Sequence, residues 1–206
     1  MTTKLKLYNA ALREVGKSKL SALTEAREDR YVLDDVYEDV IRLCLELGQW
    51  KGATKTVEVE ASASIEPTFG YEYAFPKPSD WIRTTALSAD ENLSTPLLEY
   101  KDENGYWLAR VKPLYVSYVS DDVEFGLDLS SWPPSFSRYA ELSLAYRIAA
   151  RITENESMRD RIAKDLKIAK SDAQSMDAMN GPTAFAQTGA WVQARVGSGF
   201  RKYNRA

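Results

Sequence analysis

Three pairs of neighbouring carboxylates are the residues of this sequence that could do chemistry: Asp34-Asp35, Asp102-Glu103 and Asp121-Asp122. Paired carboxylates can act as general acid and base, and their oxygens can bind hard cations such as Mg²⁺ or Ca²⁺. Both uses need the two groups to converge on one point. Neighbours in a helix or strand point in different directions. We therefore interpret the pairs as solvated surface, with a metal site or acid–base chemistry as the alternative.

The other groups that could catalyse a reaction lack their usual partners. The sequence contains no histidine, so serine and cysteine nucleophiles have no imidazole to activate them, and the commonest zinc ligand is missing. Gly197-Ser198-Gly199 lacks the lysine of a phosphate-binding loop. The one cysteine, Cys44, lies among leucines, so we expect a buried apolar side chain. We predict no enzymatic activity, no cofactor and no metal.

Charge is distributed unevenly along the 206 residues, whose formal net charge is -3. Residues 181–206 contain four basic residues and no Asp or Glu, so the remainder carries a net charge of -7. An acidic body argues against a broad phosphate-binding surface, which needs clustered Lys and Arg. No stretch of 18 to 20 apolar residues and no signal-peptide core is present, so we expect a soluble, non-exported protein without a membrane partner.

Two helices are expected at the start of the chain. The first contains Leu5, Tyr8, Leu12 and Val15 and can end at Gly16, because glycine accepts the left-handed conformation. A longer helix can begin at Thr24 and end near Gly48 and Trp50. Its apolar residues follow the 3-4-3-4 steps of a bundle seam: Leu33, Val36, Val40, Leu43 and Leu47.

Strands are expected between residues 53 and 119. Thr56 to Glu60 alternates, and Tyr71, Tyr73 and Phe75 fall on one face of a short strand, which we expect to be buried. Further strands are predicted at 81–87, 97–101, 106–111 and 114–119. Asn104-Gly105 predicts a tight hairpin, because both residues tolerate positive φ.

Two more helices are expected after the strands. Trp132-Pro133-Pro134 opens a third helix, since proline fits the first turn. Thr153, with Glu156 three residues later, can cap a fourth helix. Two apolar stripes follow helical spacing: Phe136, Tyr139, Leu142, Tyr146, Ala149 and Ile152 in the third helix, and Met158, Ile162, Leu166, Ala169, Ala173 and Met176 in the fourth.

These elements predict an α+β fold: an antiparallel bundle of about four helices with an inserted antiparallel β-sheet subdomain and an extended C-terminal arm. We divide the chain into residues 1–52 (first half of the bundle), 53–120 (inserted subdomain), 121–180 (linker and second half of the bundle) and 181–206 (C-terminal extension). The arm carries widely spaced aromatic anchors between residues that break regular structure.

The order of four segments resembles tail tubular protein A, the head-to-tail adaptor (connector) family of podovirus-type tailed bacteriophages. The resemblance covers roughly residues 5 to 155, and the middle segments are its more specific part. The segments are Asn9-Ala-Ala-Leu12 with Gly16 and a helix closed by Trp50, Tyr71-Glu-Tyr-Ala-Phe-Pro-Lys-Pro-Ser-Asp-Trp-Ile-Arg83, Pro113-Leu-Tyr-Val-Ser-Tyr-Val119, and Trp132-Pro-Pro-Ser-Phe136.

The resemblance implies a structural virion protein, made in the host cytoplasm and located at the portal vertex between capsid and tail. Such proteins form a dodecameric ring that binds the portal protein, seats further tail proteins (nozzle or tail tube) and surrounds the channel through which genomic DNA leaves. We expect the arm to bind portal or a neighbouring subunit through Phe185, Trp191, Val192, Arg195, Phe200, Arg201, Tyr203 and Arg205.

Two other classes of function stay open at this point. The basic arm could instead serve a small nucleic-acid-binding or DNA-packaging accessory protein, whose binding to DNA would be weak and removed by salt because only four basic residues contribute. An enzyme of unknown type is the third possibility.

Overall fold

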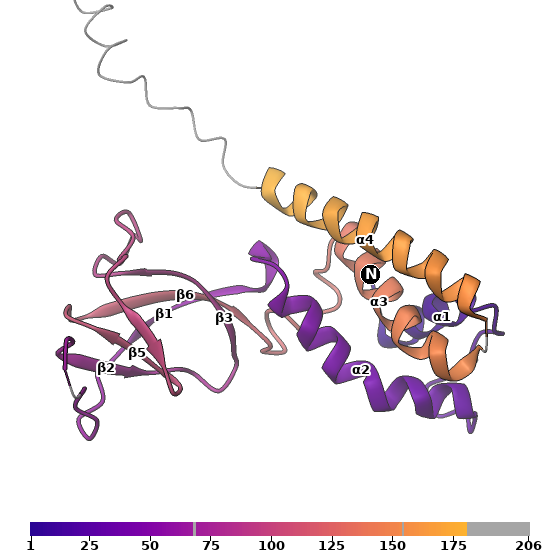
Figure 1. Ribbon diagram of the computed structural model, residues 1–206, viewed down its shortest axis with the longest axis horizontal. Helices are drawn as coiled ribbons and strands as arrows, with labels where there is room; N and C mark the ends of the chain where they lie inside the picture. Colours follow the sequence, from indigo (N-terminus) through magenta and orange to yellow (C-terminus); the bar gives the residue numbers. More distant parts are fainter. Residues whose placement is uncertain (68, 154, 181–206) are drawn as a thin grey trace, which may run out of the picture.

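A computed structural model describes residues 1–67, 69–153 and 155–180. This part of the chain forms four α-helices and two small antiparallel sheets, so the predicted α+β class is confirmed. The helices gather at one end of an elongated molecule and the sheets at the other (Figure 1). All six strands lie between the second and third helices in the sequence.

The first helix has the expected ends. α1 (Lys4–Glu14) begins at Thr3, whose hydroxyl accepts a hydrogen bond from the amide of Lys6 at 3.3 Å. This bond satisfies one of the amides that the first turn leaves without a partner. After Val15 the chain leaves the helix at Gly16, where φ is +71°, a conformation that favours glycine.

The second helix begins later than predicted and buries a different stripe. α2 (Glu28–Glu46) begins four residues after Thr24. Leu33 and Val40 are buried as expected, but Leu43 is 51% and Leu47 38% exposed. The prediction that these two leucines face the core is wrong, because successive residues turn by about 100° and the inward direction is occupied by Cys44.

The third helix is the centre of the helical part. α3 (Pro134–Ile152) contacts α1, α2 and the fourth helix, and Figure 1 shows it between α2 and that helix. Packing on several sides explains why more residues are buried than the predicted stripe contains. The buried residues are Phe136, Ser137, Tyr139, Ala140, Leu142, Leu144, Ala145, Ile148 and Ala149.

The fourth helix, α4 (Glu156–Met179), is capped by a different residue from the predicted one. The side chain of Asn155 accepts a hydrogen bond from the amide of Met158 at 3.2 Å. Thr153 instead ends α3, because its own amide and hydroxyl both donate to the carbonyl of Ala149. Of the predicted stripe, Ile162, Ala169 and Ala173 are buried, whereas Met176 is exposed.

The first sheet continues from α2 through a short 3-10 helix, η1 (Lys51–Ala53). It contains β1 (Thr54–Val59), β3 (Trp81–Ser88) and β6 (Leu114–Ser120), with β6 in the middle. Both pairings are antiparallel, and Thr54 lies opposite Val119 at the end nearest the helices.

The second sheet contains β2 (Tyr73–Pro76), β4 (Lys101–Glu103) and β5 (Tyr106–Ala109), in the order β2-β5-β4. Asn104 and Gly105 join β4 to β5 with φ of 46° and 81°, which confirms the predicted hairpin. The strands predicted for the antiparallel subdomain are thus divided between two sheets, and the strand predicted at 97–101 is wrong. Leu97 instead donates its amide to the carbonyl of Leu87, and β4 begins only at Lys101.

The predicted aromatic face of β2 holds only in part. Phe75 is fully buried, but Tyr73 is half-buried and Tyr71 precedes the strand. Ala74 is fully buried as well, so simple alternation does not describe this strand. The reason is that β2 lies at the sheet edge, where a neighbouring loop also covers it: Ser62 donates its amide to the carbonyl of Ala74 at 2.7 Å.

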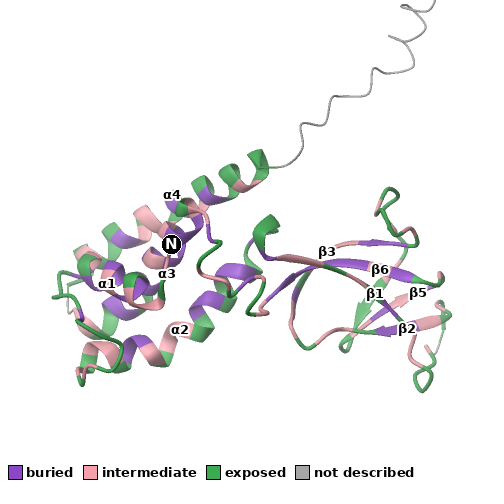
Figure 2. Cartoon of the chain, turned by 180° about the vertical axis from the view of Figure 1, so that it is seen from behind, coloured by how far each residue is buried: buried purple, intermediate pink, exposed green. Residues whose placement is uncertain are grey.

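Two apolar cores meet along the first sheet. One fills the helical part and the other lies between the sheets. β3 supplies Ile82 to the first core and Leu87 to the second, and β6 supplies Val119 and Val116 in the same way. Figure 2 shows the buried residues continuing from the helices into β6. The sheets are therefore joined to the helices by shared strands as well as by the connecting chain.

Candidate functional site

The three carboxylate pairs form ion pairs with cations and do not converge within a pair. Asp34 illustrates this, because it accepts a hydrogen bond from the hydroxyl of Tyr8 at 2.7 Å and lies against Arg30 and Lys4. Each carboxylate of the three pairs has its own cation within 4.0 Å: Asp34 with Arg30, Asp35 with Arg151, Asp102 with Lys77, Glu103 with Lys101, Asp121 with Arg42, and Asp122 with Lys55.

The surroundings of Asp34 change the proton affinity of two groups. Burial alone would raise the pKa of Asp34, but the hydrogen bonds from Tyr8 and Lys4 and the charge of Arg30 outweigh it and lower that pKa. The pKa of Tyr8 is raised well above its usual value, mainly by burial and also by the bond to Asp34. Asp34 therefore stays ionised and Tyr8 neutral near pH 7, an arrangement that stabilises α1 against α2. Within residues 1–67, 69–153 and 155–180, no three acidic or cysteine side chains gather closely enough to hold a metal ion.

A polar cluster that the sequence did not predict lies where the first sheet meets the helices. Asp80 is its centre: it accepts hydrogen bonds from Lys55 at 2.9 Å, Ser120 at 2.7 Å and Tyr118 at 3.1 Å. Asp122 shares the ammonium group of Lys55 at 3.1 Å. We call these five residues the junction cluster, because β1, β6 and the loops on either side meet in it.

Hydrogen bonds and burial shift the pKa of Asp80 in opposite directions. Burial would raise its pKa, but the hydrogen bonds from Ser120, Lys55 and Tyr118 together lower it. The pKa of Lys55 is raised by hydrogen bonds to Asp80 and Asp122. Burial, followed by the bond to Asp80, raises the pKa of Tyr118 to about 12. All three groups thus keep their ordinary charge states near neutral pH, so the junction cluster is suited to fixing the sheet in place.

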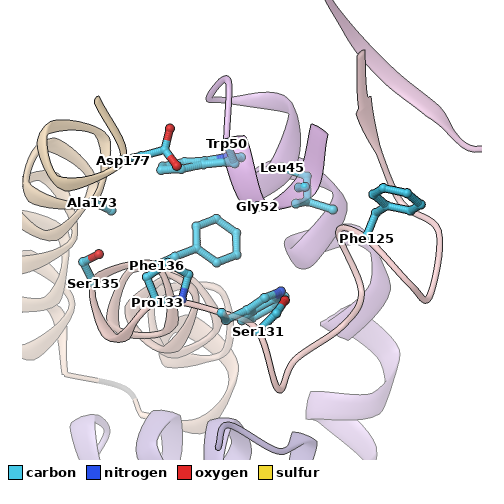
Figure 3. A pocket seen from close by; sticks show the side chains of 12 residues that line it. Leu45, Trp50, Gly52, Phe125, Ser131, Pro133, Ser135, Phe136, Ala173 and Asp177 are labelled. Atoms are coloured by element: carbon cyan, nitrogen blue, oxygen red, sulfur yellow. The ribbon is translucent and has the colours of Figure 1, made fainter. Parts of the chain in front are cut away.

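Aromatic side chains fill the space between η1 and the start of α3 (Figure 3). Phe136 packs edge to face against Trp50 and Trp132, with ring centroids 4.7 Å apart in both pairs. The indole of Trp50 donates to the carbonyl of Cys44, and that of Trp132 donates to the carbonyl of Gly126. The cavity left between them has a volume of only about 30 Å³. This region is a packed joint with room for about one water molecule.

Cys44 is buried beside this aromatic joint, as predicted. Burial raises the pKa of its thiol to about 11, so the reactive thiolate is scarce at neutral pH. Within the chain it has no second cysteine with which to form a disulfide.

An open groove of about 460 Å³ runs between α2 and α4, with α3 as its floor. We call it the basic groove, because its three charged residues are all cations while the remainder is mostly apolar. The lining residues are Val40, Leu43, Cys44, Leu47, Tyr139, Ser143, Tyr146, Arg147, Ala163, Leu166, Lys167 and Lys170. The sequence did not predict this groove, because Leu43 and Leu47 were assigned to the core.

The residues predicted to bind a partner fall outside residues 1–67, 69–153 and 155–180. They are Phe185, Trp191, Val192, Arg195, Phe200, Arg201, Tyr203 and Arg205. Their role as a binding segment stays a prediction.

Comparisons with known proteins give no family for this chain. No protein-family model matches the sequence, and no curated protein matches it. In the part of the chain that the structure describes, every helix is too short or too polar to cross a membrane.

Proposed function

We propose that this protein is a structural subunit of a tailed-bacteriophage virion, a head-to-tail adaptor that forms a ring between portal and tail around the DNA exit channel. The proposal begins from the order and spacing of the segments that resemble the adaptor family. In finer detail, α1 to α4 act as a bundle, the two sheets as an inserted subdomain, and residues 181–206 as an arm that attaches to portal.

One observation carries the proposal: segments that resemble the family, far apart in the sequence, contact one another in two places where the helices meet the sheets. Asp80 of the second segment accepts a hydrogen bond from Tyr118 of the third. Phe136 of the fourth segment packs against Trp50, which follows α2. Each of the later segments therefore contributes a residue to the contacts between the helices and the sheets.

Attachment to portal is tested most directly by mass measurement. Purified protein is mixed with portal-bearing particles, and the mass gained per portal vertex gives both the partner and the number of copies. We expect a dodecameric increment. A mixture in which the particles gain no mass would contradict the proposed function.

The arm is tested with a chain that ends at Asn180. Deletion of residues 181–206 should leave the melting temperature of the remaining protein nearly unchanged and abolish attachment to portal. Within the arm, Trp191→Ala should weaken attachment by about 2 kcal/mol or more, because aromatic anchors dominate such interfaces. Arg205→Ala is the comparison, since an exposed charge contributes at most about 1 kcal/mol. Undiminished attachment of the truncated chain would move the binding surface to the described part of the molecule.

The second candidate is a nucleic-acid-binding or DNA-packaging accessory protein. The observation in its favour is the concentration of four basic residues and no acidic ones in residues 181–206. Titration with duplex DNA at low and physiological salt separates the two functions. An adaptor should show only weak binding that physiological salt removes, whereas an accessory protein should still bind.

A further inference from the structure

The basic groove is an unpartnered surface with both apolar and charged components. Leu43 and Leu47 expose apolar surface on its α2 side. Arg147, Lys167 and Lys170 supply the charge on the α3 and α4 side, and none of them forms an ion pair with the described residues. Exposed leucines beside unpaired cations fit a partner helix that carries carboxylates and an aromatic side chain.

A second surface of the chain has this complementary composition. Residues at three- and four-residue steps share one exposed face of α2, which we call the acidic face. Its members are Tyr31, Asp35, Glu38, Asp39, Arg42 and Glu46. Arg42 is paired with Asp121 and Asp35 with Arg151, so Glu38, Asp39 and Glu46 give the face its negative balance. Tyr31, 51% exposed, provides an aromatic side chain of the kind that anchors interfaces.

Neither surface can satisfy the other within one molecule. The acidic face and the groove residues Leu43 and Leu47 belong to the same rigid helix, with Leu43 one turn after Asp39, so the face borders the groove and cannot fold into it. Among residues 1–67, 69–153 and 155–180, one ion pair joins the acidic face to α3: Asp35 with Arg151, at 3.6 Å. Pairing two acidic faces would bring like charges together, which is unfavourable.

We propose that the basic groove of one copy receives the acidic face of α2 from a second copy of this chain. In this head-to-tail contact each copy gives its acidic face to one neighbour and its groove to the other, so the contact can repeat from copy to copy and close a ring or extend a chain. This inference rests on the proposed function, since it assigns the surfaces through which neighbouring subunits of the ring would meet. Carboxylates against the cations of the groove and Tyr31 against Leu43 and Leu47 form the contact.

Charge reversal tests each surface separately. The groove variant carries Lys167→Glu and Lys170→Glu, and the face variant carries Glu38→Lys and Asp39→Lys. The control carries Lys17→Glu and Lys19→Glu, two exposed lysines outside both surfaces. Circular dichroism establishes that every variant is folded. Self-association is then measured by sedimentation velocity at low and physiological salt.

We expect the wild type and the control to associate, more strongly at low salt, and each of the two variants to associate about tenfold or more weakly. An equimolar mixture of the two variants should associate again, because the groove variant retains its acidic face, the face variant retains its groove, and the two reversed surfaces are complementary to each other. Association of both variants at the wild-type level would overturn the inference.

Disulfide trapping tests the contact directly and also applies to copies bound to portal particles. In a Cys44→Ala background, one chain carries Glu38→Cys or Asp39→Cys and the other carries Lys167→Cys or Lys170→Cys. Mixed disulfides should form between the two kinds of chain. The inference fails if none forms either in solution or on particles, or if only Glu38→Cys chains cross-link with each other.

Two competing occupants of the groove are tested with the same reagents. If a chain ending at Asn180 no longer associates, the C-terminal segment fills the groove and the inference is wrong. If a 20-base-pair DNA duplex binds at physiological salt and the groove variant loses this binding, the groove binds phosphate and the inference is again wrong. Continued association of the truncated chain, without such DNA binding, supports it.

The result is separable from the test of the proposed function. A chain that gains mass on portal particles but gives no mixed disulfide refutes the subunit contact and leaves the adaptor function standing. A chain that gives mixed disulfides in solution but does not bind portal refutes the adaptor function and leaves the contact standing.

Discussion

Replacing Phe136 by alanine tests whether the aromatic joint holds the helices to η1. Phe136 is only 4% exposed and lies within 6.1 Å, ring centroid to ring centroid, of Trp50, Trp132 and Tyr139. Truncating a buried phenylalanine costs about 3 to 5 kcal/mol. Edge-to-face contacts add about 0.5 to 1.5 kcal/mol each beyond the area that they bury, so we expect the upper half of that range.

The assay is urea unfolding followed by tryptophan fluorescence and circular dichroism. The variant should have a lower midpoint and an unchanged slope, since the surface exposed on unfolding is nearly the same. A loss of about 4 kcal/mol also corresponds to a fall of about 8 to 16 °C in melting temperature for a chain of this size.

Phe69→Ala is the matched control, because it makes the same chemical change at a side chain that is 82% exposed. It should change the free energy of unfolding by less than about 0.5 kcal/mol. If Phe136→Ala cost no more than Phe69→Ala, the joint would not be part of the stabilising core, and the argument from its packing would be wrong.

Three further predictions concern the junction cluster, a close backbone contact and the thiol. Asp80→Asn should lower the urea midpoint at pH 7. The difference in midpoint between variant and wild type should narrow below about pH 4, because the lowered pKa of Asp80 gives stability that is lost as pH falls through the pKa of the folded protein. Equal differences in midpoint at pH 7 and pH 3 would argue against this. Gly126→Ala should destabilise the protein, since an added Cβ would lie 2.1 Å from the carbonyl oxygen of Ser120, whereas Gly52→Ala, with no atom within 4 Å, should not; equal urea midpoints would contradict the contact. Cys44 should react with a disulfide reagent at pH 8 only after unfolding, because burial raises the pKa of its thiol; rapid labelling of the folded protein would count against its burial.

Local signals in the sequence predicted the elements whose structure depends on neighbouring residues. Gly16, with its positive φ, marks the end of α1, and Asn104-Gly105 forms the hairpin for the same conformational reason. Pro134 opens α3, where its missing amide costs no hydrogen bond. Each of these depends on backbone preferences that act over a few residues.

Features that depend on distant partners were missed. Lys55, Asp80 and Ser120 come together only through the pairing of β1 and β3 with β6, and no spacing in the sequence indicates their contact. Within the sequence, the resemblance of residues 71–83 to the adaptor family was the only signal near Asp80. The cap at Asn155 was missed for a related reason, since both Thr153 and Asn155 can cap a helix and the actual end of α3 decides between them.

Leu43 and Leu47 are exposed although their spacing predicted burial. Their 3-4-3-4 spacing is typical of a helix seam that packs against a partner, and the first part of that seam, at Leu33 and Val40, is buried within the chain. The later part borders the basic groove instead. Apolar side chains that border an open groove, beside the helix that covers the rest of their seam, fit the proposed intersubunit contact, in which they would become buried. Mutation of Leu43 and Leu47 to serine should therefore weaken self-association and cost the monomer only about 1 kcal/mol per side chain, because each is only partly buried. A cost of about 2 to 5 kcal/mol each, typical of a fully buried leucine, would return both to the core.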